Sequence, residues 1–397
     1  MPSNILIKII GAKYYLPSLV LAFGLISMCT SFVHNYEGLL ACRFFLGFAE
    51  GGMMPGAAYY LSCFYRRHEL LFRVNLFITG ATLAGAFGGL LAAGLTQIPR
   101  WGVDSAQPIH TWRNIFFFEG IVTMIVASST LFYLPDTPDK CKFLSPRDRY
   151  IALERINREH KETEAEKIRP HHVYRAIFNI NNILCALGFF FINVSVQSIS
   201  LFLPTILNAL GWTAIRSQLY SVPPYVVATF WAIFISWVSD FYKKRGYFIL
   251  LNNAIAITGY AILVTTNSDN LRYLGVFLAA AGAFPLGPFF LSWGLNNAAG
   301  PSIRAVAGGY IVALGTGGAI LATWTYRVTD KPEYRRGHAL NLGTNACAAI
   351  VAIVLIFYTR WENKMRAAGK RDHRLDGLSE TEKDQLGYSH PEFRYTE

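Results

Sequence analysis

Residues 41–56 read ACRFFLGFAEGGMMPG, an apolar and glycine-rich run that contains two full charges, Arg43 and Glu50. The run lies inside a longer apolar stretch, 38–62, and about 20 apolar residues allow a helix to cross a bilayer. A charge at the bilayer centre costs a few kcal/mol on insertion scales, so a charged side chain within a span usually faces a cavity. The stretch therefore predicts a membrane helix with a polar face.

The composition of the whole chain is that of an integral membrane protein. Of its 397 residues, 53% are hydrophobic and 15% are charged, whereas about 25% of residues are charged in soluble globular proteins. The net charge of +11 would suggest a nucleic-acid partner in a soluble protein, but here it reflects basic loops, and no nucleic-acid partner is expected. The six cysteines are scattered without metal-binding or disulfide spacing, so we expect no metal and no cofactor.

Apolar runs long enough to cross a bilayer recur along the chain. They are continuous rather than alternating, and only helices or closed barrels satisfy the backbone in lipid, so the pattern favours helices. We therefore predict an all-α polytopic membrane protein. The ten runs lie at about 15–33, 38–62, 75–96, 114–134, 177–204, 219–239, 247–266, 272–295, 306–326 and 340–359.

Basic residues concentrate on one side of these runs. Most of the 36 lysine and arginine residues fall on the side that includes the polar segment 135–175 and the tail from residue 360. Because Lys and Arg are enriched in cytoplasmic loops, this side is predicted to be cytoplasmic. Ten spans then place both termini of the chain in the cytoplasm, and we expect the membrane to be the plasma membrane.

The long polar segment divides the runs into four before it and six after it. SDFYKKRGYFIL (239–250) occupies the place in the second group that NILIKIIGAKYYL (4–16) occupies in the first. Equal halves would contain six helices each, which predicts that the first helix and most of the second are missing from the chain. The expected regions are an incomplete N-terminal helical half (1–134), a cytoplasmic linker (135–175), a C-terminal six-helix half (176–359) and a cytoplasmic tail (360–397).

Three short motifs resemble those of the major facilitator superfamily. SDFYKKRG resembles the acidic–basic–glycine loop between the second and third helix of a half, although its acidic position is Ile5 in the first half. RFFLGFAEGG (43–52) resembles the arginine motif of the fourth helix, and GATLAGAFGG (80–89) the glycine-rich motif of the fifth. The residues to which we assign helix contact or gating are Gly47, Gly85, Gly88, Gly89, Asp240, Arg245, Gly246, Gly317 and Gly318.

Further segments narrow the resemblance to the anion:cation symporter branch. Within this branch, the chain is most similar to the fungal allantoate, nicotinate and pantothenate permeases. The resemblance implies two pseudo-symmetric helical halves and a chain that begins near the end of the second helix. The segments that carry it are PSNILIKIIG, TWRNIFFFEG, LPDTP, KPEYRRGHALNLG and the tail HRLDGLSETEKDQLGYSHPEFRY.

Arg43 and Glu50 are seven residues apart, so they share one helix face and lie roughly 10 Å apart along the axis, with Gly47 between them. The planar guanidinium of arginine suits a carboxylate. Surroundings of low dielectric favour the neutral form of glutamate, which a reversible proton carrier requires. A structural alternative is that Arg43 extends to the outer membrane surface and Glu50 neutralises it.

The second half lacks these charges. Its corresponding run, VFLAAAGAFPLGP (276–288), keeps the glycines but has Leu278 and Pro285 in place of the charged residues. Packing that the two halves share therefore does not require the charges. In the resembled family, an arginine and a glutamate at this spacing imply substrate binding by Arg43 and proton coupling by Glu50.

Polar residues also occur within spans of the second half. Asn193, Gln197 and Ser200 share one helix face, where they either join helices through polar contacts or form a neutral wall of the substrate cavity opposite Arg43. Tyr225 is a weaker candidate for the same wall. The glycines of 80–89 and 308–318 are expected to allow close helix contact.

Glu119 is the third charge within a span. It lies about one turn into its helix and close to Arg113 in sequence, so we expect a structural ion pair at the outer surface. The alternative is a role in transport.

Together these features predict a proton-coupled symporter for a small organic anion, a monocarboxylate such as nicotinate, allantoate or pantothenate. The partners expected are the anion, the proton and the lipid bilayer, and the protein is expected to be a monomer. The chain contains no Walker loop, GxSxG or HExxH motif, so we do not expect an enzyme. The alternative is a membrane nutrient sensor that does not transport, or an inactive truncated fragment.

Overall fold

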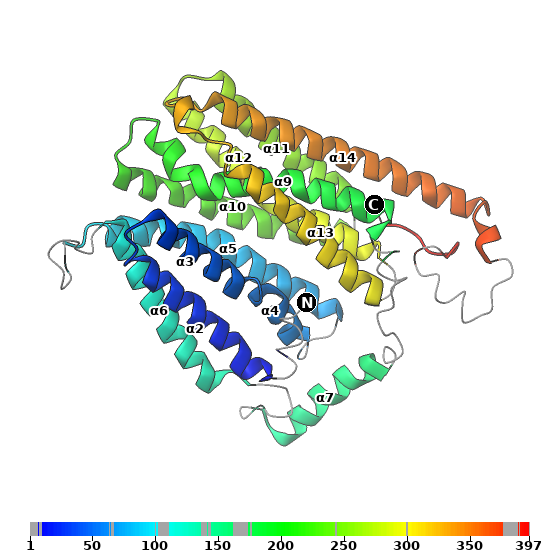
Figure 1. The fold of residues 1–397 in the computed structure, drawn as a ribbon. Coiled ribbons are helices and arrows are strands. Elements are labelled where there is room, and N and C mark those ends of the chain that lie inside the picture. Colours follow the sequence, from blue (N-terminus) through cyan, green and yellow to red (C-terminus); the bar gives the residue numbers. More distant parts are fainter. Residues whose placement is uncertain are drawn as a thin grey trace. The chain divides into compact units, whose positions relative to one another are not determined.

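The computed structural model describes residues 7, 10–62, 64, 67–99, 101, 111–135, 141, 144–161, 174, 177–242, 244–298, 301–375, 388 and 390–396. The elements within these residues are helices, as the continuous apolar runs predict (Figure 1). The chain divides into two compact units, residues 1–77 with 88–165, and residues 78–87 with 166–397. Much of the linker that the sequence predicts at 135–175 lies outside the described residues.

The first unit is built on a close contact between two helices. A Cβ at Gly120 would lie 2.7 Å from the Met28 nitrogen and 2.8 Å from the Gly24 carbonyl, so the backbones of α2 and α6 meet where side chains are absent. The helices of this unit are α2 (Ala12–Thr30), α3 (Tyr36–Glu50), α4 (Met53–Ser62), α6 (Trp112–Tyr133) and α7 (Pro146–Lys161), and α5 (Arg67–Leu95) has residues in both units.

The apolar run 38–62 forms two helices, whereas the sequence predicts one. The helix α3 ends at Glu50 and α4 begins at Met53, with a turn between them. Pro55 contributes to the break, because proline has no N–H to donate to the carbonyl four residues earlier. The glycines of the turn also have low helix propensity. Glu50 is therefore the last residue of a 15-residue helix.

The second unit is a bundle in which α9 to α14 run alongside one another (Figure 1). The Asn179 side chain caps the first of these helices by accepting a hydrogen bond from the Asn181 N–H at 2.9 Å. The helices are α9 (Ile180–Asn208), α10 (Ala214–Tyr242), α11 (Arg245–Thr265), α12 (Asp269–Asn296), α13 (Pro301–Ala322) and α14 (Arg335–Ala367), with short 3₁₀ turns η2 (Val328–Asp330) and η3 (Asp372–Leu375).

Helices long and apolar enough to cross a membrane occur in both units. In the described part of the chain there are seven of them, namely α2, α6, α9, α10, α11, α12 and α14. Leu83–Leu95 of α5 and Val306–Ala322 of α13 are shorter apolar segments. Each of the ten predicted runs overlaps one or two described helices, so the prediction of an all-α polytopic membrane protein is confirmed.

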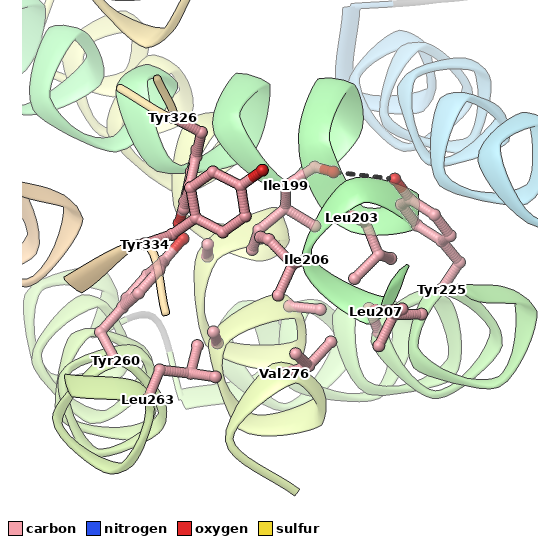
Figure 2. Packing of buried hydrophobic residues seen from close by; sticks show 14 of the residues in the cluster. Ile199, Leu203, Ile206, Leu207, Tyr225, Tyr260, Leu263, Val276, Tyr326 and Tyr334 are labelled. Carbon is pink, nitrogen blue, oxygen red and sulfur yellow. Dashed lines mark hydrogen bonds between the residues drawn. The ribbon is translucent and has the colours of Figure 1, made fainter. Parts of the chain in front are cut away.

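The interior of the second unit holds its helices in fixed positions. Leu203, Tyr260 and Val276 belong to one apolar cluster that fills the space between α9, α11 and α12 (Figure 2). The helices α11 and α12 approach so closely that a Cβ at Gly259 would lie 2.7 Å from the Gly275 carbonyl. Such close packing fixes the polar side chains that these helices carry.

Candidate functional site

Arg43 lies in the middle of α3, and its side chain is exposed in the first unit. The guanidinium carbon is 5.4 Å from the ring centroid of Phe116 on α6, a cation–π arrangement. All residues of α3 are described, and Ala49 is the one that is buried. The helix therefore presents Arg43 on an open face, against an aromatic ring and not against an acid.

Glu50 ends α3, and its side chain is also exposed. Neither Glu50 nor Arg43 forms an ion pair with any residue that the structure describes. Between them, no described atom lies within 4 Å of the position that a Cβ on Gly47 would occupy. The two opposite charges thus border the same open surface of α3 without a direct contact.

The corresponding part of α12 is closed. Pro285, which replaces the glutamate, is buried, and Leu278, which replaces the arginine, is half-buried. A Cβ at Gly282 would lie 2.7 Å from the Asn252 carbonyl of α11 and would also contact the Ala256 backbone. The glycine that the two halves share therefore serves helix packing in the second half.

Asn193 connects two helices of the second unit. Its side-chain amide donates a hydrogen bond of 3.0 Å to the Gly315 carbonyl of α13. Ser200 is exposed and donates to the Val196 carbonyl of its own helix at 2.9 Å, and Gln197 is half-buried. Asn193 thus has a helix-joining contact, and the substrate-cavity role of Asn193 and Gln197 remains a prediction.

Tyr225 lies in the apolar cluster of the second unit (Figure 2). Only 5% of the residue is exposed, and its hydroxyl donates a hydrogen bond of 3.3 Å to the Ile199 carbonyl of α9. A Cβ at Gly85, whose segment 78–87 groups with the second unit, would lie 3.1 Å from the Tyr225 ring. The hydroxyl of Tyr225 is therefore already engaged with the backbone of a neighbouring helix.

The predicted packing glycines have different surroundings. A Cβ at Gly318 would contact the Phe190 carbonyl and would lie 3.2 Å from the Val194 nitrogen, whereas one at Gly317 would lie 3.5 Å from the Phe190 ring. These values place α13 directly against α9. At Gly88, by contrast, no described atom lies within 4 Å of the added carbon.

The basic–glycine loop leads directly into α11. Gly246 is its first buried residue, and a Cβ there would lie 2.6 Å from Ile356 of α14 and 2.9 Å from Trp293 of α12. Arg245 is half-buried at the start of the helix. Gly89 is buried within α5, whereas the side chain of Asp240 lies outside the described part of the structure.

A buried polar network that the sequence analysis did not identify joins α9 to α14. Ser195 donates to the Asn341 side-chain oxygen at 3.1 Å and accepts from the Asn345 amide at 2.6 Å. The Asn341 amide lies 3.3 Å from the Tyr326 hydroxyl, which in turn is 3.0 Å from Nδ1 of His338. The serine, both asparagines and the histidine are 0% exposed.

Part of this network could be predicted from the spacing of its residues in the sequence. Asn341 and Asn345 are four residues apart, so they share one face of α14, as Ser195 and Ser198 share one face of α9. The sequence does not show that these two faces meet, because 146 residues separate Ser195 from Asn341. The network consists of neutral donors and acceptors, and it fixes the relative position of two helices.

The expected ion pair between Glu119 and Arg113 is wrong. The Arg113 guanidinium donates to the Val33 carbonyl at 2.9 Å and lies 3.4 Å from Nδ1 of His34. Six residues turn a helix by about 600°, which places the two side chains on different faces. Arg113 instead reaches the segment that follows α2.

A further arginine of the second unit is buried, and the sequence analysis did not identify it. Arg272 is 7% exposed and donates to the Glu333 carbonyl at 2.9 Å. It lies in the first turn of α12, where it connects this helix to the segment that precedes α14. Its engagement with a backbone carbonyl contrasts with the open surroundings of Arg43.

A family profile and individual known proteins similar to this chain point to the same family. The family profile described as Major Facilitator Superfamily matches residues 1–323. The MFS-type transporter efuF of Hormonema carpetanum is 29% identical over 92% of this chain and 74% of its own length. An uncharacterised transporter of Schizosaccharomyces pombe is 30% identical over 96% of this chain and 77% of its own length.

A solved structure shows the same fold. The crystal structure of a D-xylose–proton symporter aligns with a TM-score of 0.62 and 14% sequence identity, over 89% of this chain and 82% of that chain. At this identity the likeness concerns the fold alone. The likeness agrees with the helical architecture and the apolar helices described above.

Proposed function

Because the chain belongs to the major facilitator superfamily, we propose that this member is a proton-coupled symporter of a small organic anion. The relatives named above are transporters, which supports a transport function for this member of the family. The proposed substrate is a monocarboxylate such as nicotinate, allantoate or pantothenate. Proton coupling is named for the solved D-xylose–proton symporter, which supports the compatibility of this fold with such coupling.

One observation carries the proposal. Arg43 and Glu50 border the same open surface of α3, and neither has an ion-pair partner among the described residues. Arg43 has the planar donor geometry that holds a carboxylate. Gly47 leaves the space between the charges open. An arginine that served packing alone would be expected to have a fixed acceptor, as Arg272 has in the Glu333 carbonyl.

The charges suggest how proton and anion binding are linked. With Glu50 ionised, the two charges roughly cancel, and an anion gains little at Arg43. Protonation of Glu50 leaves the arginine uncompensated, so the anion binds more tightly. Linkage is reciprocal, and bound anion therefore raises the affinity of Glu50 for the proton. Alternating exposure of the site by rocking of the two halves would then move both together, as in transporters with parallel repeats.

Purified protein in proteoliposomes tests the coupling role. A panel of labelled monocarboxylates first identifies a substrate under an inward proton gradient. The Glu50→Gln variant is expected to lose uphill uptake while it retains exchange of labelled for unlabelled substrate. Glu37→Gln, which removes an exposed charge from the first turn of the same helix, is the matched control and should transport normally. An unchanged pH dependence in Glu50→Gln would rule out the coupling role.

The same assay addresses the alternative function. A nutrient sensor without transport activity, or an inactive fragment, would bind a carboxylate or nothing and show neither uptake nor exchange.

We also propose a monomer in the plasma membrane with both termini in the cytoplasm, since most basic residues fall on that side. Protease accessibility of a C-terminal tag in sealed cells tests the orientation.

A further inference from the structure

The end of the chain is docked against the second unit. The Thr396 carbonyl accepts hydrogen bonds from the Trp293 indole at 2.9 Å and from the Asn297 amide at 3.2 Å. The Asn297 side-chain oxygen accepts from the Thr396 N–H at 2.8 Å. Asn363 of α14 pairs with the Tyr395 backbone through two hydrogen bonds of 2.9 Å. Paired polar contacts therefore hold this segment at the ends of α12 and α14.

Arg366 is the charged centre of this contact. It is 4% exposed, it donates to the Phe393 carbonyl at 2.8 Å, and its guanidinium carbon lies 4.7 Å from the Tyr395 ring centroid. Glu362, one turn earlier, accepts from Arg366 Nε at 3.1 Å. A buried, compensated arginine with these partners fixes the position of residues 390–396, which we call the docked tail.

A basic pocket lies between the docked tail and α14. It is a shallow hollow that is largely open to solvent, with a volume of ≈ 570 Å³. The lining residues are Arg360, Asn363, Lys364, Ala367 and Arg394. Three of these five residues are cationic and none is acidic, so the pocket favours a ligand with several anionic oxygens.

Neighbouring residues hold the two guanidinium groups of the pocket, and the Glu362 carboxylate of α14 is paired with other arginines. Arg360 donates to the Tyr247 hydroxyl and lies over its ring at 5.6 Å. Arg394 donates to the Pro391 carbonyl at 2.6 Å. The Glu362 carboxylate is engaged by Arg366 and by Arg371 Nη2 at 2.7 Å. These contacts hold both guanidinium groups in position beside the docked tail.

The pocket also lies where an apolar helix becomes basic. Phe357 and Trp361 of α14 are 67% and 52% exposed, and Phe357 shares a helix face with Lys364, seven residues later. Tryptophan is enriched at membrane–water interfaces, and four to eight basic residues next to a span attract anionic lipid. The basic residues from 360 to 374 are Arg360, Lys364, Arg366, Lys370, Arg371 and Arg374.

We propose that this pocket binds the phosphate-bearing headgroup of an anionic phospholipid, and that the docked tail is part of the site. Arg360, Lys364 and Arg394 would bind the phosphate oxygens, and the acyl chains would continue along the exposed face that carries Phe357. A soluble phosphate would use the same cations but would gain nothing from the apolar face. The inference does not depend on the transported substrate.

Binding of a short-chain lipid to the purified full chain tests the proposal. Dioctanoyl phosphatidic acid is titrated in neutral detergent, with dioctanoyl phosphatidylcholine as the zwitterionic control and microscale thermophoresis as the readout. Phosphatidic acid should bind and phosphatidylcholine should not. Lys364→Gln and Arg394→Gln should each weaken binding by about tenfold or more, the loss expected for one hydrogen bond to a charged group. Both side chains are exposed, so the variants should unfold at the wild-type temperature.

Matched variants distinguish binding in the pocket from a general effect of positive charge. Lys370→Gln removes an exposed positive charge of the same basic stretch from outside the pocket, and Arg336→Gln removes one near the start of α14. Neither should alter binding. A chain that ends at residue 387 lacks the docked tail and should lose at least as much affinity as Arg394→Gln. Equal losses of lipid affinity in Lys370→Gln and Lys364→Gln, or unchanged binding in the truncated chain, would show that the pocket is not the binding site. Displacement of the lipid by equimolar inorganic phosphate would overturn the lipid as its ligand.

Discussion

The helices α3 and α12 correspond in the two halves of the sequence, yet their glycines have opposite surroundings. At Gly282 of α12, an added Cβ would lie 2.7 Å from the backbone of α11. At Gly47 of α3, no described atom lies within 4 Å of such a carbon. The helix α12 runs for 28 residues through two prolines, whereas α3 ends after 15 residues.

The difference shows that one small-residue pattern has two uses. In α12 the glycine allows a neighbouring backbone to approach, and the helix contains leucine and proline where α3 contains its charges. In α3 the glycine leaves space beside Arg43 and Glu50, and neither residue has an ion-pair partner among the described residues. We therefore regard α12 as the structural version of the motif and α3 as the functional one.

The largest effect is expected when α3 receives the residue of α12. Arg43→Leu copies Leu278 and should weaken binding of the carboxylate by about thirtyfold or more, because truncation of one partner of a hydrogen-bonded charge pair costs about 2–5 kcal/mol. Equilibrium binding of the labelled substrate to purified protein measures this change. The variant should fold normally, since the side chain is exposed in its unit. Wild-type affinity in a folded variant would show that Arg43 does not bind the substrate.

The glycines themselves provide the second test. Gly282→Ala should destabilise the protein by about 3 kcal/mol, the upper part of the usual cost of overpacking, because the new methyl group overlaps the backbone of α11. Gly47→Ala should change stability by no more than about 1 kcal/mol, the difference in helix propensity between the two residues. Thermal unfolding in one detergent compares them. Equal losses would show that α3 is packed as tightly as α12.

The two arginines provide the third test. Arg272→Leu removes the donor to the Glu333 carbonyl and should cost about 2 kcal/mol of stability, as expected for a hydrogen bond from a charged group. The substrate KM of the folded protein should not change. Arg272→Lys keeps the charge and should recover part of the stability. A raised KM with unchanged unfolding temperature would place Arg272 in the transport site and weaken the contrast with Arg43.

The smallest effect concerns the aromatic support of Arg43. Phe116→Leu removes the ring beneath the guanidinium and should raise the substrate Kd about two- to fivefold, because an exposed cation–π contact contributes about 0.5–1 kcal/mol. Phe132→Leu alters an exposed ring near the other end of α6 and is the matched control. Identical Kd values for both variants would show that Phe116 does not position Arg43.

Much of the fold could be predicted because its causes are local. Every apolar run long enough to span a bilayer overlaps described helices, since burial of the backbone in lipid requires internal hydrogen bonds. The position of Arg43 and Glu50 within one such run was equally visible. Apolar length alone does not predict the break between α3 and α4, whereas the low helix propensity of Pro55 and of two glycines favours it.

The candidate contacts were harder to predict because they are not local. The pairing of Ser195 with Asn341 spans 146 residues, and that of Trp293 with Thr396 spans 103. Proximity in sequence favours Glu119 as the partner of Arg113, but Arg113 reaches the Val33 carbonyl, 80 residues away in the chain. Spacing shows which residues share a face of one helix, but it does not show which face of another helix they meet.

The sequence by itself determined that the chain is a helical membrane protein and that two opposite charges, Arg43 and Glu50, share one face of α3. Apolar length, glycine spacing and charge are properties of short segments, so they are readable without a fold. Only the tertiary structure decided that Gly282 is packed while Gly47 is open, and that the last residues dock beside Lys364. Those outcomes depend on which backbones approach each other, and close packing over long sequence separations fixes that approach.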